Sequence, residues 1–239
     1  MLDTVIIIPY RAREKHLKHF LDHTAPLLKK HIPNGKIVIV EQDWNNKLFN
    51  RGCLLNIGVK EYENKTHHII THDVDINPSE KSIKELYLPS IDNNTIKGLY
   101  NLSDQTDTLG GIIKMKNSTF FRINGFPNDI WGWGAEDFAL KFRAQFLGIK
   151  IQKTYREPDI FKRNNNKMYK NEYYTVFNDI NDRNAINNSI NIVKYNLNQY
   201  NTKTSIISNI SSSGLNNLKY KINKKTIIND YVELINVSI

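Results

Sequence analysis

The sequence predicts an α/β fold with a mostly parallel central sheet flanked by helices. Three runs rich in β-branched residues carry this prediction: Thr4–Pro9, Lys36–Glu41 and His67–Asp73. Continuous apolar runs of this length are typical of strands covered on both faces, as in a parallel sheet. Between them, His16–His31 and Cys53–Glu61 have apolar residues at helical spacing. Strands that alternate with helices in this way favour βαβ units.

The following part of the chain continues this pattern. We expect a loop with a short helix at Pro78–Pro89, and strands at Thr95–Leu102, Ile112–Met115 and Ile149–Tyr155, the last of these being the final strand of the sheet. Helices are predicted at Asn117–Ile123 and Ala135–Leu147, because each combines apolar periodicity with polar residues at its start.

The composition changes after about residue 155. The Asn-rich segments 163–170 and 177–191 have little apolar periodicity and are predicted to form loops and a short helix over the core. A closing hairpin is predicted from strands at Tyr220–Ile222 and Tyr231–Val237, with the turn at Asn223–Lys225.

The chain of 239 residues is predicted to be one domain, residues 1–239. Residues 1–155 would form its core, and residues 156–239 the Asn- and Lys-rich loops and closing C-terminal segment. A single cysteine, Cys53, excludes an internal disulfide. The apolar run Val5–Pro9 is too short for a membrane span or a signal peptide. We therefore expect a soluble protein of a reducing compartment, cytoplasmic or virion-associated, or a fragment released from an anchor.

The formal net charge is +9. Such a charge suits nucleic acid, an anionic membrane surface or an anionic small substrate. The sequence has neither a zinc-finger pattern nor an RNA-binding aromatic signature, and much of the excess Lys after Lys162 is interleaved with Asn. Solvated surface explains these lysines, so nucleic acid is not an expected partner, although a basic scaffold for anionic glycans stays open.

Trp131–Asp137 (WGWGAED) is the most distinctive stretch. Glycines beside large rings let the backbone bend close to a ligand, and an indole plate suits the face of a sugar ring. The carboxylates of Glu136 and Asp137 would open a helix, whose dipole favours their charged form. A charged carboxylate there can act as general base for a sugar hydroxyl. The alternative is a buried Trp cluster with two helix-capping acids.

Charged residues follow two of the predicted strands. Arg11 and Arg13 come after the first strand, at the edge where open α/β sheets bind ligands. Arginine forks suit phosphate or carboxylate, although a pair of surface arginines is the alternative. Asp73 and Asp75 end the third strand, where alternation would point both to one side. Two such carboxylates can hold a hard divalent cation that bridges a diphosphate.

Two further motifs suggest ligand contacts. Phe49 could stack on a base and Arg51 could reach a phosphate, with Asn50 as cap of the following helix; Phe49 could equally be a hydrophobic staple. Gly110 and Gly111 precede a strand and suggest close approach of the backbone to a ligand, or an ordinary strand-entry bulge.

These motifs, taken as an ordered set, resemble the β-1,4-galactosyltransferase family, or glycosyltransferase family 7. The motifs are Pro9–Arg13, Phe49–Gly52, Asp73–Asp75, Leu109–Gly111, Asn124–Asn128 and Trp131–Asp137. The similarity extends from about Val5 to Ile151 and reappears at Ser213–Leu218. The resemblance implies a GT-A type fold and transfer of galactose from UDP-galactose to a sugar hydroxyl, with Mn²⁺ and with inversion.

The resemblance also implies a role for each matching residue. Asp137 would be the catalytic base and Glu136 would bind the sugar, while Asp75 would ligate the metal. The acceptor would meet Trp133, Asp137 and Phe138. The donor-binding residues would be Pro9, Arg11, Arg13, Phe49, Arg51, Asp73, Val74, Asp75, Thr108, Gly110, Gly111 and Trp133, of which Trp133 lies on the family's mobile loop.

Three departures from the family pattern bear on specificity. All seven His lie at or before His72, so the loop after the last predicted sheet strand, Ile149–Tyr155, lacks the His that binds the metal in the family. Glu157, Asp159 or Met168 could replace it, and Mg²⁺ could serve if oxygen replaces nitrogen. Phe138 stands where the family has an acid that grips N-acetylglucosamine. Thr108 stands where a Tyr is common, and its smaller side chain could admit UDP-GalNAc.

The sequence thus predicts an inverting glycosyltransferase that moves a hexose from a UDP-sugar to a glycan or glycoside hydroxyl with a divalent metal. Galactose is the expected sugar and GalNAc the second choice, and the metal is Mn²⁺ or Mg²⁺. The alternative is a catalytically inactive sugar- or nucleotide-binding module.

Overall fold

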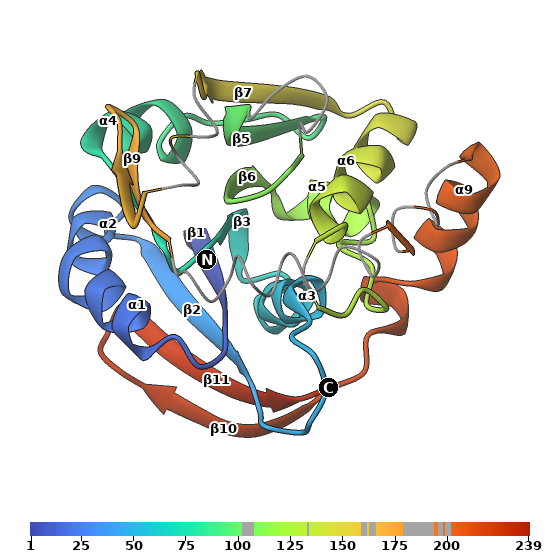
Figure 1. Ribbon diagram of the computed structural model, residues 1–239, viewed down its shortest axis with the longest axis horizontal. Helices are drawn as coiled ribbons and strands as arrows, with labels where there is room; N and C mark the ends of the chain where they lie inside the picture. Colours follow the sequence, from blue (N-terminus) through green and yellow to red (C-terminus); the bar gives the residue numbers. More distant parts are fainter. Residues whose placement is uncertain are drawn as a thin grey trace.

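The computed structural model describes residues 1–101, 108–132, 134–158, 162, 166–178, 194–195, 198 and 202–239. Within this part of the chain, an eight-stranded sheet forms the centre of the molecule, in the order β10-β11-β2-β1-β3-β6-β5-β7 (Figure 1).

The middle of the sheet is parallel. β1 (Leu2–Tyr10) lies between β2 (Gly35–Gln42) and β3 (Thr66–His72), and pairs with both in parallel. These are the three strands that the apolar runs predict. The parallel arrangement brings their carboxyl ends to one edge, where ligands bind in open α/β sheets.

The other half of the sheet is mixed. β6 (Ile112–Lys116) runs antiparallel to β3 and to β5 (Thr95–Asn101), and β7 (Lys150–Arg156) pairs in parallel with β5 at the edge. Each of these strands lies where the sequence predicts one. The prediction of a mostly parallel sheet is confirmed, with antiparallel pairing at β6 and β10.

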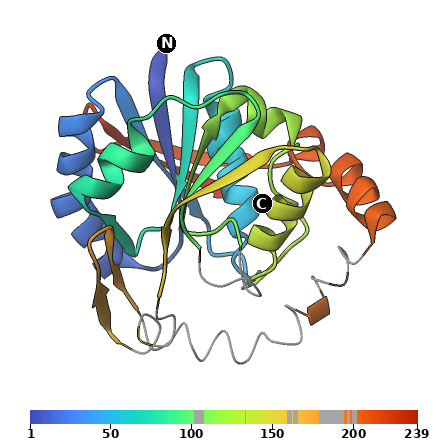
Figure 2. The same cartoon turned by 90° about the horizontal axis from the view of Figure 1, so that it is seen from above.

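Helices cover both faces of the sheet (Figure 2). One face carries α1 (Glu14–His19), η1 (Phe20–Thr24) and α2 (Ala25–His31), which together form the predicted first helix. The other face carries α3 (Arg51–Glu61), α5 (Asn117–Arg122) and α6 (Glu136–Phe146).

β1 divides its side chains between two cores. Ile6 and Ile8 pack on the side of α1 and α2, while Val5 and Ile7 pack on the side of α3, and all four are fully buried. α3 approaches β1 closely at Gly58, where a Cβ atom would lie 2.3 Å from Cγ2 of Ile7. A glycine at this position therefore sets the distance of α3 from the sheet.

A second, three-stranded sheet lies beyond the end of β3 and is not predicted by the sequence. It has the order β4-β9-β8, made of β4 (Ile76–Pro78), β9 (Tyr174–Phe177) and β8 (Met168–Lys170). The prediction of loops over residues 163–170 is therefore wrong for β8, which is too short to show a periodic pattern. Most of the other Asn-rich segment, residues 179–191, lies outside the described residues. Between β4 and β5, α4 (Glu80–Ser82) and η2 (Ile83–Tyr87) form the predicted short helix.

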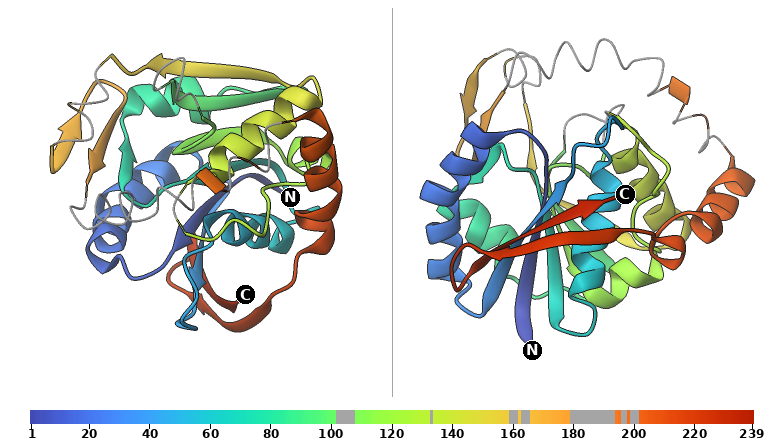
Figure 3. Two further views of the ribbon diagram at one scale, coloured as in Figure 1. Left: turned by 45° about the vertical axis from the view of Figure 1, so that its right-hand side comes forward. Right: turned by 90° about the horizontal axis from the view of Figure 1, so that it is seen from below.

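The C-terminal part of the chain returns to the main sheet. α9 (Lys203–Ser212) and η3 (Leu215–Asn217) lead into the antiparallel hairpin of β10 (Lys221–Ile227) and β11 (Val232–Ser238) (Figure 3). The hairpin is confirmed, but its turn follows β10 and does not lie at Asn223–Lys225. β11 pairs in parallel with β2, so β7 is not the last strand of the sheet. Among the helices that the structure describes, none is long and apolar enough to cross a lipid bilayer.

Candidate active site

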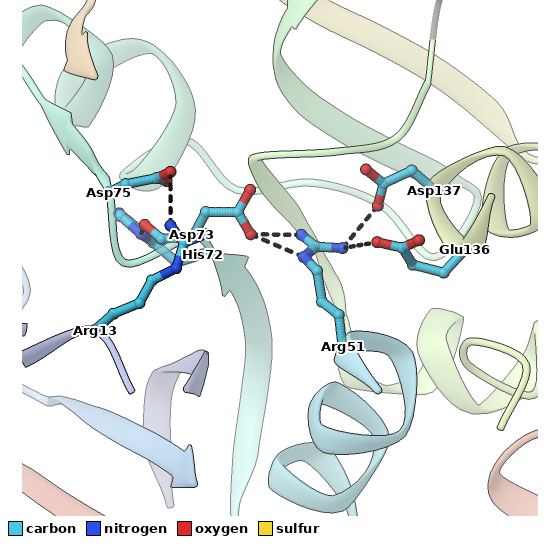
Figure 4. Close-up of polar contacts among 7 residues, drawn as sticks. All are labelled: Arg13, Arg51, His72, Asp73, Asp75, Glu136 and Asp137. Carbon is cyan, nitrogen blue, oxygen red and sulfur yellow. Dashed lines mark hydrogen bonds and ion pairs between the residues drawn. The ribbon is translucent and has the colours of Figure 1, made fainter. Parts of the chain in front are cut away.

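The turn after β3 presents two carboxylates at the carboxyl edge of the sheet. β3 ends at His72, so Asp73 and Asp75 lie in a turn and strand alternation does not apply to them. Asp73 pairs with Arg51, whereas Asp75 lies 3.5 Å from Nη1 of Arg13 (Figure 4). The prediction that both residues continue the strand is therefore wrong, because the chain turns immediately after His72, and each carboxylate pairs with a different arginine.

Arg51 is the first residue of α3 and is fixed by the cap before it. The side chain of Asn50 accepts a hydrogen bond from the Cys53 backbone N–H at 2.9 Å, which confirms the predicted N-cap. The amide nitrogen of Asn50 donates to the Asn128 carbonyl at 2.7 Å. The start of α3 is thereby tied to the segment that precedes the tryptophan motif.

The Arg51 guanidinium joins carboxylates from two separate elements (Figure 4). Its Nε donates to Oδ1 of Asp73 at 2.9 Å, and its Nη1 donates to Oδ1 of Asp137 at 2.7 Å and contacts Oε1 of Glu136 at 3.5 Å. The arginine side chain is 12% exposed. The structure thus brings together the predicted base, the predicted sugar-binding acid and a predicted donor contact.

Three carboxylates share this one buried guanidinium, so negative charge is in excess. Burial disfavours the charged form of Arg51, but Asp137, Asp73 and Glu136 outweigh it and raise the pKa of Arg51 above its ordinary value. Burial also raises the pKa of Glu136. Burial, with the charges of Glu136 and Asp73, raises the pKa of Asp137 to about 8 despite the opposing effect of Arg51. A carboxyl with such a pKa can exchange a proton near neutral pH.

The glycine pair before β6 fits closely against this cluster. A Cβ atom on Gly110 would lie 2.2 Å from Oδ2 of Asp137. Gly111 has a φ of +72°, and its carbonyl accepts a hydrogen bond from the Asp73 backbone N–H at 3.2 Å. The pair therefore lets the backbone approach the Asp137 carboxylate at Gly110 and the Asp73 backbone at Gly111. Thr108, half-buried just before the pair, accepts a hydrogen bond from Lys153 at its carbonyl.

The tryptophan motif approaches the site in a backbone conformation that glycine favours. Gly132 and Gly134 have φ values of +87° and +86°, and Ala135, which immediately precedes α6, has φ +78°. The Gly132 N–H donates to the Phe49 carbonyl at 2.9 Å. The half-buried Trp131 lies beside Lys47, whose Nζ is 5.3 Å from the indole ring centre. Trp133 lies outside the described residues.

The other residues predicted to contact the donor or the acceptor lie outside the Arg51 cluster. Phe138 is half-buried and stacks on Phe142 with ring centres 6.4 Å apart. Pro9 is buried near the end of β1, and the Val74 side chain packs in the core. The Arg11 guanidinium lies 5.6 Å from the Phe49 ring centre.

Sequence reasoning missed several residues that hold the site in place. Nδ1 of the buried His72 lies 2.8 Å from the Asp73 carbonyl, so this nitrogen is the donor. Burial lowers the pKa of His72 to about 4, which keeps the ring neutral. Asn56 on α3 donates to the carbonyl of Phe126 at 2.7 Å and accepts from the Phe126 N–H at 2.9 Å. Single His and Asn residues carry no sequence signal of such roles, because their partners are set by the folded chain.

The described residues fit a divalent cation only in part. Asp75 offers the hard oxygen that Mn²⁺ and Mg²⁺ accept. In the part of the chain that the structure describes, no group of three His, Cys, Asp or Glu side chains could hold a metal ion. Of the suggested replacements for the missing His, Glu157 accepts hydrogen bonds from Tyr169 and Tyr174. Met168 is exposed, and Asp159 lies outside the described residues.

Comparison with known proteins gives two family matches. Residues 2–87 match the N-terminal region of glycosyl transferase group 7, and residues 99–175 match the N-terminal domain of galactosyltransferase. β-1,4-Galactosyltransferase 4 of Cricetulus griseus is 34% identical over 176 residues, which cover 66% of this chain and 46% of that protein. β-1,4-Galactosyltransferase 3 of Homo sapiens is 33% identical over 156 residues, which cover 63% and 39%. The chain thus spans less than half the length of these relatives.

Solved structures show the same fold. The structure of a Drosophila β-1,4-galactosyltransferase 7 mutant in complex with manganese, UDP-Gal and xylobiose matches with a TM-score of 0.71 at 23% identity, covering 100% of this chain and 94% of that one. S. aureus TarS matches with a TM-score of 0.50 at 13% identity, covering 88% and 71%. These neighbours confirm the predicted GT-A type fold. Together with the two family matches, they show that the chain belongs to glycosyl transferase group 7, the family of the β-1,4-galactosyltransferases.

Proposed function

We propose that this chain is an inverting glycosyltransferase that moves a hexose from a UDP-sugar to a hydroxyl of a glycan or glycoside. The observation that carries the proposal is the cluster in which Arg51 holds Asp73, Glu136 and Asp137 together. In this cluster, carboxylates from the end of β3 and from the start of α6 meet at the carboxyl edge of the sheet, where α/β folds bind ligands.

Asp137 is the proposed base. Its carboxylate takes the proton from the acceptor hydroxyl as that oxygen attacks the anomeric carbon, and the bond to UDP breaks on the opposite face of the sugar. One displacement of this kind inverts the configuration at that carbon. Glu136, 8% exposed beside Arg51, is proposed to bind the sugar.

The donor diphosphate is proposed to lie near Arg13 and Asp75. Arginine forks pair well with phosphate oxygens. Asp75 would hold a divalent metal, Mn²⁺ as the first candidate and Mg²⁺ as the alternative. Such an ion neutralises charge on the departing UDP. Support for Mn²⁺ and UDP-Gal comes from the Drosophila relative, which was solved in complex with both.

Two residues bear on the choice of sugar. Thr108 is proposed to leave room for an N-acetyl group, so UDP-GalNAc is the second candidate donor. Phe138, stacked on Phe142, presents an aromatic ring directly after the base in the sequence, where it is proposed to meet the acceptor. A ring favours the apolar face of a sugar over a charged or amide group.

Release of UDP tests the proposal. The protein is incubated with UDP-galactose and Mn²⁺ over a panel of glycan and glycoside acceptors. We expect Asp137→Asn to abolish turnover while it retains UDP binding, because the amide cannot take the proton. Asp230→Asn is a matched control, since Asp230 is exposed and forms a surface ion pair with Lys29. Full activity in Asp137→Asn would contradict the assignment of the base.

The alternative of an inactive binding module has no observation in its favour. Asp75 pairs with Arg13, and Arg51 contacts the proposed base directly. UDP binding without turnover on any acceptor and with either metal would be the result that revives it.

A further inference from the structure

Trp44 is a largely exposed aromatic residue beside the proposed donor site. It follows the end of β2, and the residue is 80% exposed. The Arg11 guanidinium lies 5.5 Å from the Trp44 ring centre and 5.6 Å from the Phe49 ring centre. Single exposed apolar residues are common on protein surfaces, but this one contacts a predicted donor-binding arginine.

The loop that carries Trp44 is held in place by hydrogen bonds. Nη1 of Arg11 donates to the Lys47 carbonyl at 2.9 Å. The Gln42 side chain donates to the Leu48 carbonyl at 2.9 Å and accepts from the Asn50 N–H at 2.9 Å. The exposure of the indole is therefore a feature of an ordered loop, one that also supports the start of α3.

The position of Trp44 corresponds to the nucleoside end of the donor. In the proposed reaction the sugar lies beside Asp137, where the acceptor hydroxyl attacks, and the diphosphate lies beside Asp75 and Arg13. The Trp44 ring lies farther along the strand ends, beside Arg11, which directly follows β1. A UDP-sugar laid from Asp137 past Asp75 thus brings its base toward Arg11 and Trp44.

We propose that Trp44 stacks on the nucleobase of the UDP-sugar and forms the outer wall of the nucleotide pocket, with Arg11 and Phe49 beside it. This inference rests on the proposed function. A pyrimidine is planar with two apolar faces, and an indole offers it a wide π surface. Arg11, which contacts the Trp44 ring, would bind the ribose or a phosphate.

Calorimetry with UDP and with pyrophosphate, both in the presence of Mn²⁺, tests this inference. We expect Trp44→Ala to weaken UDP binding about five- to tenfold, the effect of losing one base–aromatic stack. Pyrophosphate binding should not change, because pyrophosphate has no base. Trp44→Phe should restore most of the UDP affinity. Because Trp44 is exposed, all three proteins should melt within a few degrees of one another.

Intrinsic fluorescence gives a second readout. UDP should quench the emission of the wild-type protein, and the quenching should fall sharply in Trp44→Phe. Unchanged UDP affinity in Trp44→Ala, or equal weakening of UDP and pyrophosphate, would overturn the stacking role alone. Failure of the wild-type protein to bind UDP at all would overturn the proposed function and the stacking role with it.

Discussion

Asp137 is buried among other acidic groups, and burial together with these neighbours raises its pKa. Asp73 and Glu136 share Arg51 with it, so removal of one proton from the cluster makes removal of the next more difficult. The three carboxyl groups therefore lose their protons in linked steps. The direction is nonetheless clear, because burial and neighbouring charge both raise the pKa of Asp137.

The activity should depend on pH accordingly. A base works only when ionised, so kcat/KM should rise with pH and level off near the raised pKa of about 8. Below that value, the slope should approach a tenfold change per pH unit, since one proton must leave the free enzyme. The measurement is a pH–rate profile with UDP-galactose at subsaturating concentration. A profile that is already flat from about pH 5, near the ordinary range of a carboxyl group, would contradict the raised pKa.

Gly110 is a position where a single methyl group should disturb the site. A Cβ atom there would lie 2.2 Å from Oδ2 of Asp137, so Gly110→Ala must displace the carboxylate. We expect a loss of kcat of about a hundredfold, the cost of roughly 1 Å of misplacement. Overpacking at this buried position should also lower the free energy of unfolding by about 1–3 kcal/mol.

Gly148→Ala is the control for Gly110→Ala. Gly148 has φ +66°, and a Cβ atom there would meet no described atom within 4 Å. The change should therefore cost about 1 kcal/mol of stability through the backbone alone. Its activity should remain. Wild-type activity in Gly110→Ala would show that the carboxylate does not need its present position.

The elements around the tryptophan motif are joined by a polar connection. Asn128 precedes the motif and bonds to the C-terminal part of the chain: its N–H donates to Oγ of Ser213 at 2.8 Å, and its side chain donates to the Gly214 carbonyl at 2.7 Å. Arg143 of α6 donates to the carbonyls of Gly125 at 2.8 Å and Ser213 at 2.6 Å. The two family motifs 124–128 and 213–218 thus contact each other, and both are hydrogen-bonded to residues on either side of the tryptophan motif.

Arg143 should therefore matter for stability and much less for donor binding. The residue is fully buried, and Arg143→Met would leave buried carbonyls without these donors. We expect the free energy of unfolding to fall by about 3 kcal/mol, measured by urea denaturation. Gln145→Met, on an exposed position of the same helix, should change it by less than about 0.5 kcal/mol. A greatly weakened UDP affinity in folded Arg143→Met would assign Arg143 a more direct role.

Across the whole molecule, the site joins elements that are far apart in the chain. Arg51 begins α3, Asp73 follows β3, and Asp137 lies in the first turn of α6. A ligand that contacts all of these stabilises the folded state only, so its binding should raise the unfolding temperature.

We expect UDP with Mn²⁺ at about 100 times the dissociation constant to add about 2.7 kcal/mol. For a chain of this size, that is a rise of about 5–10 °C in Tm. EDTA should remove the part of this rise in Tm that depends on the metal. Asp75→Asn should lack the same part of the rise. The same rise from UDP in EDTA and in Mn²⁺ would contradict a metal held by Asp75.

Most of the fold could be predicted from local pattern. The strands β1, β2 and β3 are buried on both faces, so their sequences are continuously apolar and easily recognised. β8 and β9 could not be found in this way, because strands of three and four residues are too short for a period to show. β11 could be found as part of a hairpin, but its pairing with β2 depends on the path of the whole chain.

Hydrophobic period and side-chain chemistry are local properties, so the amino-acid sequence alone was enough for the α/β class, the order of the motifs and the residue types of the site. Which of these residues meet could be read only from the folded chain. Asp73 and Asp75 are two residues apart in the sequence, yet they pair with different arginines. Arg51 and Asp137 are 86 residues apart, yet Nη1 of Arg51 lies 2.7 Å from Oδ1 of Asp137. Electrostatic contacts depend on distance in space. Here the turn after β3 places Asp73 and Asp75, and the close approach of the Gly110 backbone to Asp137 leaves room for its carboxylate.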